Sequence, residues 1–241
     1  MRKGIWRSAS NLWGLKQKRS PYLVIMAALN EEQGIGPTIE EVNFFLNNPA
    51  FLVIDGNSKD RTIEIAKSCD AKILEQKGRG KGDAICFGIE NADFDGKYAI
   101  MIDSDFTYPA EFIPEMVRIL EEDPDVGMVC GNRFNDKFKI QGMERKFLVG
   151  NKILAFIHNF FNGVNLKDPL TGLRVIRWDA IKNWKPKSLG FDIEVELNHF
   201  IEKQGYRIVE IPIGLRRRLG KKKLGILDGL SIFKRIVLKT I

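Results

Sequence analysis

The chain has 241 residues, 44% hydrophobic and 29% charged, which fits one large folded domain and excludes a compositionally disordered chain. The formal net charge is +7, but residues 1–19 contribute +6 and residues 215–241 contribute +8, so residues 20–214 carry −7. A nucleic-acid binder usually carries its positive charge on the folded body, so this distribution argues against nucleic acid as a partner.

The N-terminal segment, residues 1–20, is basic and carries apolar residues at helical spacing, namely Ile5, Trp6, Ala9, Leu12 and Trp13. This pattern is typical of an amphipathic helix that lies on an anionic membrane surface. The segment has neither the continuous apolar run nor the cleavage site of a secretory signal. The alternative is a helix that packs on the protein's own body or on a second copy.

From residue 21 onward, short apolar runs alternate with helical patterns. The runs at 22–28, 51–55, 71–75, 98–103 and 126–130 are predicted strands, and helices are expected at 62–68 and 109–122. This alternation predicts an α/β fold with a doubly wound, mostly parallel sheet flanked by helices.

After residue 131 the pattern changes to a long helix at 146–161, a turn at 167–172 and a strand, helix and strand at 173–176, 193–202 and 206–211. A second amphipathic helix is expected at the basic C-terminus, with apolar residues Leu227, Leu230, Phe233, Ile236, Val237 and Ile241, and for it too the alternative to a membrane surface is packing on the protein's own body or on a second copy. We therefore divide the chain into a basic N-terminal segment (1–20), a folded domain (21–222) and a basic C-terminal helix (223–241). No apolar stretch reaches the roughly 20 residues that a membrane-spanning helix needs.

Three cysteines, Cys69, Cys86 and Cys130, lie far apart in apolar contexts, without metal-ligand spacing, which indicates free thiols in a reducing compartment. His158 and His199 have no partner at ligand spacing, so we assign them no catalytic role.

Polar residues follow three of the predicted strands directly, and in open α/β sheets ligands bind beyond the carboxyl ends of the strands. Asp103 and Asp105 flank Ser104 at the end of one apolar strand. Two carboxylates there would hold Mg²⁺ or Mn²⁺, which prefer oxygen ligands and keep positions open for phosphate oxygens. The alternative is a solvated acidic turn.

Residues 77–82, with the sequence KGRGKG, combine a flexible backbone with three cations, which suits close approach to a nucleotide diphosphate. The segment lacks the spacing of a Walker A loop, and no Gly-x-Gly-x-x-Gly follows the first strand, which argues against a Rossmann dehydrogenase. The alternative is a solvated basic loop.

Six segments, AALNEE, VIDGNSKDRT, KGRGKGDAI, DSDFTYP, GNRF and DPLTGLRVI, occur in the order and spacing found in one enzyme family. Over about residues 21–225 the chain resembles family 2 glycosyltransferases with the GT-A fold, and within them the polyprenyl-phosphate sugar synthases of the dolichol-phosphate mannose synthase type. The resemblance implies a Rossmann-like α/β domain that uses a divalent cation, magnesium or manganese.

The resemblance also implies roles for individual residues. It implies catalytic roles for Asp103, Asp105, Arg133 and Asp168, with Asp103 and Asp105 as metal ligands. It places Ala27, Leu29, Glu31, Asp55, Lys81, Ser104 and Arg133 with both aspartates at the nucleotide sugar, and Arg145, Thr171, Arg174, Arg218 and Lys223 at the acceptor or its phosphate. Two positions depart from the family: Gly56 replaces a second aspartate, and Thr107 replaces a glutamine, which leaves the third metal ligand open.

By this resemblance the expected activity is inverting transfer of mannose or glucose from a nucleotide sugar, GDP-mannose or UDP-glucose, to a polyprenyl phosphate. The expected location is the cytoplasmic face of a membrane, with peripheral attachment and a separate membrane-anchoring subunit. Two alternatives stay open, namely a soluble or polysaccharide acceptor, and a catalytically silent nucleotide-sugar-binding or scaffold protein.

Overall fold

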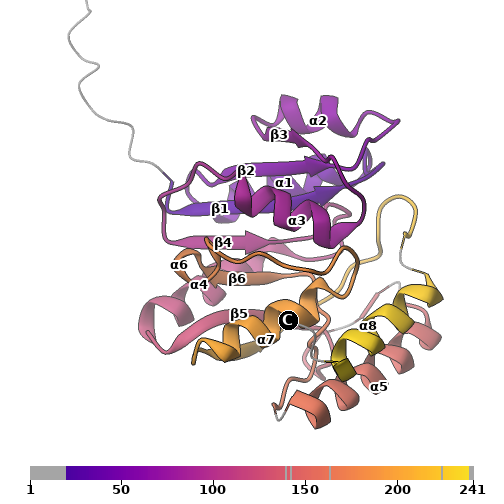
Figure 1. Cartoon of the computed structure of the whole chain (residues 1–241). Coiled ribbons are helices and arrows are strands. Elements are labelled where there is room, and N and C mark those ends of the chain that lie inside the picture. The colour runs from indigo at the N-terminus through magenta and orange to yellow at the C-terminus, as the bar shows by residue number, and fades with distance from the viewer. Residues whose placement is uncertain (1–19, 139, 142, 163, 224, 239–241) are drawn as a thin grey trace, which may run out of the picture.

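The computed structural model describes residues 20–138, 140–141, 143–162, 164–223 and 225–238. The predicted N-terminal helix and Ile241 therefore lie outside the described residues. The described part forms a seven-stranded sheet with helices on both faces (Figure 1).

The sheet has the strand order β3-β2-β1-β4-β6-β5-β7. The strands are β1 (Tyr22–Ala28), β2 (Ala50–Asp55), β3 (Lys72–Glu75), β4 (Tyr98–Met101), β5 (Val126–Asn132), β6 (Arg174–Arg177) and β7 (Arg207–Pro212). Strand β6 runs antiparallel to both of its neighbours, β4 and β5, whereas the other pairs are parallel. The predicted mostly parallel sheet is confirmed, although the strand expected at 98–103 ends at Met101.

The helices are α1 (Ile35–Phe45), α2 (Thr62–Ser68), α3 (Lys81–Glu90), α4 (Ile113–Glu122), α5 (Arg145–Asn162), α6 (Trp178–Ile181), α7 (Ile193–Lys203) and α8 (Ile226–Leu238). The helix expected at 109–122 begins as a 3₁₀ turn (Ala110–Phe112), and α4 follows with a proline in its first turn, where the missing N–H has no helical partner.

Helices cover both faces of the sheet, so the strands β1, β2, β4 and β5 are mostly buried and apolar on both sides. Successive side chains of a strand point to opposite faces. Val24 and Met26 of β1 pack into the core beneath α1, α2 and α4, whereas Leu23 and Ile25 pack into the core beneath α3, α6 and α7. Strands β1, β2 and β4 run parallel to one another, so their carboxyl ends meet at one edge of the sheet.

Helices α5 and α8 lie side by side beyond this sandwich (Figure 1). Ile232 and Ile236 of α8 are buried against Val195 of α7, and Arg235 Nε lies 2.8 Å from Asp192 Oδ2. The C-terminal helix thus packs on the protein's own body through one face, while its Leu230 and Phe233 stay exposed.

Candidate active site

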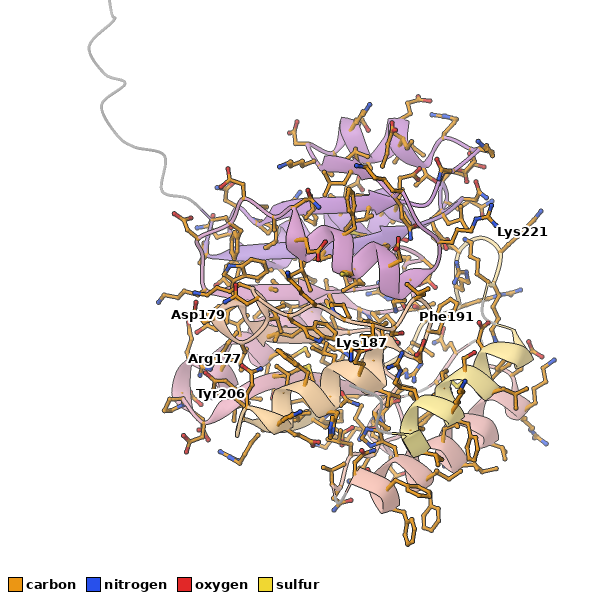
Figure 2. All side chains as sticks on the ribbon, in the orientation of Figure 1. Arg177, Asp179, Lys187, Phe191, Tyr206 and Lys221 are labelled. Atoms are coloured by element: carbon orange, nitrogen blue, oxygen red, sulfur yellow. The ribbon has the colours of Figure 1, made fainter. Side chains whose placement is uncertain are left out.

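A cleft of about 640 Å³ opens at the carboxyl ends of β1, β2 and β4. Segments that follow all three strands line it. This agrees with the rule that ligands of open α/β sheets bind beyond the carboxyl ends of the strands, which we call the strand-end rule. Figure 2 shows Phe191 and Lys221 on this side of the molecule, and Arg177 and Tyr206 at the opposite edge of the sheet. The lining residues fall into three groups, a mostly polar group that follows β1, β2 and β3 (Leu29, Gly56, Asn57, Gln76), a charged group (Lys81, Asp103, Asp105, Arg133, Arg218) that we call the charged centre, and an apolar group (Met143, Phe147, Leu170, Phe191, Leu215, Ile232) that we call the apolar end.

In the charged centre, Lys81 connects two carboxylates from distant segments. Its Nζ lies 2.6 Å from Asp103 Oδ1 and 2.6 Å from Glu194 Oε1 at the start of α7. Burial opposes a charge on both Asp103 and Lys81, but the opposite charges around them together outweigh it: Asp103 and Glu194 raise the pKa of Lys81, and Lys81, with Arg218 and Arg133, lowers the pKa of Asp103. Asp103 is therefore held as a carboxylate.

Asp105 has both oxygens engaged. Its Oδ1 accepts hydrogen bonds from the Thr107 backbone N–H at 3.0 Å and the Thr107 hydroxyl at 2.6 Å, and Arg218 Nη1 lies 2.6 Å from its Oδ2. Burial and the neighbouring charge of Asp103 raise the pKa of Asp105, and Arg218 and Thr107 offset part of that rise. Thr107 thus orients Asp105.

Arg218 and Lys223 both contact Glu31, which is only 5% exposed. Lys223 Nζ also donates to the Asn30 carbonyl at 3.0 Å. Burial raises the pKa of Glu31 although both cations act to lower it. The basic segment near the C-terminus therefore closes one side of the cleft by contacting a residue that follows β1.

Arg133 and Asp168 form a buried bidentate ion pair. Arg133 Nε lies 2.6 Å from Asp168 Oδ2, and Nη2 lies 2.7 Å from Oδ1. Glu210 of β7 accepts hydrogen bonds from the backbone N–H groups of Lys167 and Asp168, each at 2.7 Å. Since Arg133 lines the cleft and Asp168 is fully buried, the pair aims a guanidinium at the cleft and fixes its orientation.

Arg174 is 1% exposed, and its guanidinium donates to the carbonyls of Pro169 and Thr171 at 2.7 and 3.0 Å and to Asn198 Oδ1 at 2.5 Å. This geometry does not support the expected phosphate contact, because its donors are directed at protein acceptors. Thr171 is also fully buried, and Arg145 is exposed at the start of α5, outside the residues that line the cleft.

Ala27, Leu29 and Glu31, which we expect at the nucleotide sugar, all line the cleft, and the Ser104 hydroxyl donates to the Ala27 carbonyl at 3.0 Å. Asp55 is buried; its Oδ2 accepts from the Ser58 N–H at 3.0 Å, and its Oδ1 has no hydrogen-bond partner among the described residues. Asp55 is not among the residues that line the cleft, so its expected place at the nucleotide sugar stays a prediction.

Sequence reasoning missed Glu194, Glu210 and Gln76. Gln76 follows β3, so the strand-end rule applied to every strand would have found it. Glu194 and Glu210 lie within a helix and a strand, where their residue type alone carries no signal.

The carboxylate oxygens of Asp103 and Asp105 are the ligand type that a hard divalent cation prefers, and a nucleotide or water would supply its further ligands. Asp103 Oδ2 accepts no hydrogen bond from the described residues, and a Cβ at Gly172 would stand 2.5 Å from it, so the glycine keeps space beside this oxygen. No cluster of three or more acidic, histidine or cysteine side chains suited to a metal occurs within the described ranges.

The chain is similar to known proteins over most of its length. A family model for glycosyl transferase family 2 matches residues 23–184. A dolichyl-phosphate hexose transferase of Haloferax volcanii is 31% identical over 217 residues, which cover 89% of this chain and 91% of that protein. A dolichol-phosphate mannosyltransferase of Pyrococcus furiosus is 26% identical over 88% of this chain, which spans 60% of that protein.

A structural neighbour is glucosyl-3-phosphoglycerate synthase from Mycobacterium tuberculosis, solved with Mn²⁺, uridine diphosphate and glucosyl-3-phosphoglycerate. It superposes with a TM-score of 0.67 over 91% of this chain and 78% of that chain, at 23% identity, a likeness that concerns the fold. The family match and the shared fold lead to one assignment: the chain belongs to glycosyl transferase family 2 and is a glycosyltransferase with the GT-A fold.

Proposed function

We propose that this glycosyltransferase transfers a hexose from a nucleotide sugar to a polyprenyl phosphate at a membrane surface. The observation that carries the proposal is the composition of the cleft described above, which combines a mostly polar group of residues, a charged centre and an apolar end. The names of two relatives, a dolichyl-phosphate hexose transferase and a dolichol-phosphate mannosyltransferase, support the same acceptor class.

In the charged centre, the donor diphosphate would meet Lys81 and Arg218, with Arg133 oriented toward it by Asp168. Asp103 and Asp105 would hold Mg²⁺ or Mn²⁺, which when bound neutralises charge on the departing nucleoside diphosphate. The structural neighbour from Mycobacterium tuberculosis was solved with Mn²⁺ and uridine diphosphate, which supports a divalent cation here.

At the apolar end, Phe147 of α5 and Ile232 of α8 line the cleft, and Lys222 Nζ lies 2.8 Å from the centroid of the Phe147 ring. Lys222 and Lys223 also line the cleft. Cations beside apolar side chains suit a lipid phosphate, because the phosphate meets the cations and the polyprenyl chain meets the apolar surface.

The same two helices carry an exposed apolar stripe. Val149, Ile153, Phe156 and Phe160 recur along one face of α5, and each is at least 54% exposed. Leu230 and Phe233 of α8 add to the exposed apolar surface, and exposed lysines (Lys146, Lys152, Lys234) accompany both helices. Apolar residues among lysines favour an anionic lipid surface as the partner of this face, which we call the α5–α8 face.

Within the described part of the chain, none of the helices has the length and apolarity to span a bilayer. We propose that the α5–α8 face holds the protein peripherally on the membrane, on the cytoplasmic side. The three cysteines are free thiols, which agrees with a reducing compartment.

The phosphate oxygen of the acceptor is ionised at neutral pH, so the site needs positioning and stabilisation of the leaving group rather than a strong base. We propose direct displacement with inversion at the anomeric carbon. Analysis of the product by NMR tests this, and a product with retained configuration would contradict it.

The deciding experiment incubates the purified protein with labelled GDP-mannose or UDP-glucose, a polyprenyl phosphate, and magnesium or manganese. Label in the organic phase is the expected result. If no pair yields a lipid-linked product while label appears on a soluble or polysaccharide acceptor, the lipid acceptor is wrong although the transferase assignment stands.

A further inference from the structure

We infer that Gln76 reads the nucleobase of the donor as a fixed hydrogen-bond acceptor and favours bases with a ring N–H at their edge, as in uracil and guanine. The inference rests on the proposed nucleotide-sugar donor and adds the residue and the chemical edge that select its base.

The orientation of the Gln76 amide follows from its partners. The side chain is 7% exposed, and its Nε2 donates to the Gly80 carbonyl at 2.9 Å and to Asp83 Oδ2 at 2.7 Å. A carbonyl and a carboxylate can only accept, so turning the amide over would lose both bonds and set its oxygen against two acceptors. Gln76 Oε1 is therefore locked as the acceptor that faces away from residues 80–83.

Gly56 leaves open the space in front of this oxygen. A Cβ at Gly56 would lie 3.2 Å from Gln76 Oε1 and 3.5 Å from Leu29 Cβ. Leu29, Gly56 and Gln76 all line the cleft, and Leu29 is 40% exposed, so it offers an apolar flank to a planar ring. None of the described residues donates a hydrogen bond to Oε1. We call this space the Gln76 slot.

The Gln76 slot lies next to the charged centre along the chain as well as in space. Gly80, whose carbonyl holds the Gln76 amide, directly precedes Lys81, which pairs with Asp103. Gln76, Gly80 and Lys81 all line the same cleft, so one nucleotide bound there would have its diphosphate at Lys81 and its base at Gln76.

A locked acceptor discriminates between bases by their own chemistry. Uracil N3 and guanine N1 carry hydrogen and donate, whereas cytosine N3 and adenine N1 are acceptors that would face Oε1 without a proton. An unpaired acceptor in a largely buried slot costs about 1–3 kcal/mol, which corresponds to a 5- to 150-fold loss of affinity. Cytosine and adenine could donate to Oε1 only through their exocyclic amino groups, which occupy a different position on the edge, so the slot favours bases with the ring N–H.

The test measures binding of UDP and GDP, and of their 3-methyluracil and 1-methylguanine analogues, by calorimetry in the presence of magnesium. For the wild-type chain, methylation of the preferred base should weaken binding about tenfold or more. In Gln76→Met this penalty should fall below about threefold, because the acceptor is gone.

Two variants separate base reading from damage to the neighbouring loop. Gly56→Ala places a methyl group before Oε1 and leaves both Nε2 bonds, so it should weaken UDP or GDP binding while competition by inorganic pyrophosphate is unchanged. Gln204→Met removes an amide that donates to the Ala180 carbonyl, away from the cleft, and should leave the methylation penalty intact.

If methylated and parent diphosphates bind the wild-type chain equally, the role of Gln76 is wrong even where hexose transfer proceeds. The same holds if Gln76→Met retains the full penalty. If the wild-type chain binds no nucleoside diphosphate, the proposed function itself fails, and this inference fails with it.

Discussion

Arg218 Nη1 lies 2.6 Å from Asp105 Oδ2, although 113 positions separate the two residues in the chain. The guanidinium also contacts Glu31, so one cation balances two carboxylates that follow different strands. The basic segment near the C-terminus is thus part of the cleft, and charge compensation around Asp105 is built from both ends of the folded domain.

Removing the charge of Asp105 tests its role directly. We expect Asp105→Asn to lower turnover at least about 100-fold, because an amide is a weak ligand for a hard cation, while metal-independent nucleotide binding is retained. Hexose transfer and nucleotide calorimetry measure the two effects. Asp179→Asn is the matched control, since its side chain is 82% exposed, and turnover there should be unchanged. Full activity of Asp105→Asn would contradict the site.

Breaking the Arg133–Asp168 pair should destabilise the fold. In Asp168→Asn the buried guanidinium loses its counter-charge, and we expect the free energy of unfolding to fall by about 3–5 kcal/mol. Urea denaturation measures this. The double variant Arg133→Met with Asp168→Leu should recover most of the stability and still lack hexose transfer, because Arg133 lines the cleft. Recovery of transfer would show that the pair is only structural.

If the protein attaches to the membrane through the α5–α8 face, replacing exposed apolar residues of this face should weaken its binding to lipid vesicles. Phe156→Gln combined with Phe160→Gln should weaken binding to vesicles with anionic lipid about tenfold or more, because two large apolar side chains no longer enter the interface. Thermal stability should change little, since both rings are more than 70% exposed.

The matched control for this pair is Phe44→Gln, which replaces a ring that is 81% exposed on α1. Vesicle binding of this control should equal that of the wild-type chain. If the α5 double variant keeps its vesicle binding but loses self-association in light scattering, the α5–α8 face is a contact between copies.

His158 should make stability depend on pH. It is fully buried on α5, and burial lowers its pKa to about 4, from an ordinary value of 6.5. Between pH 6.5 and pH 4, His158 is protonated in the unfolded chain but stays neutral in the folded chain. The free energy of unfolding therefore falls as the pH drops toward 4.

We expect this loss to be about 2–3 kcal/mol between pH 7 and pH 4, and His158→Gln should remove it. Urea denaturation of both chains at a series of pH values measures the difference. Parallel pH profiles for the two chains would show that His158 does not titrate as its burial implies.

Much of the fold and part of the site could be predicted because their signals are local. Apolar runs and helical spacing predicted the strands and helices. The strand-end rule predicted that Glu31, Asp103 and Asp105 lie at one edge of a parallel sheet, and all three line the cleft there. Arg174 is expected to contact phosphate, but it is buried and donates to protein acceptors. A motif does not show which of its side chains are buried, so this position could not be predicted from it.

The sequence by itself determined the α/β alternation, the family motifs and the carboxylates at the strand ends, because each depends on neighbours within a few residues. Only the tertiary structure decided the antiparallel insertion of β6, the pairing of Lys81 with Glu194, the contact of Arg218 with Asp105 and the locked amide of Gln76. Most of these features join segments far apart in the chain, and even the nearby contact of Gln76 with Asp83 depends on how the loop between them packs. Such contacts are set by the packing of the whole domain.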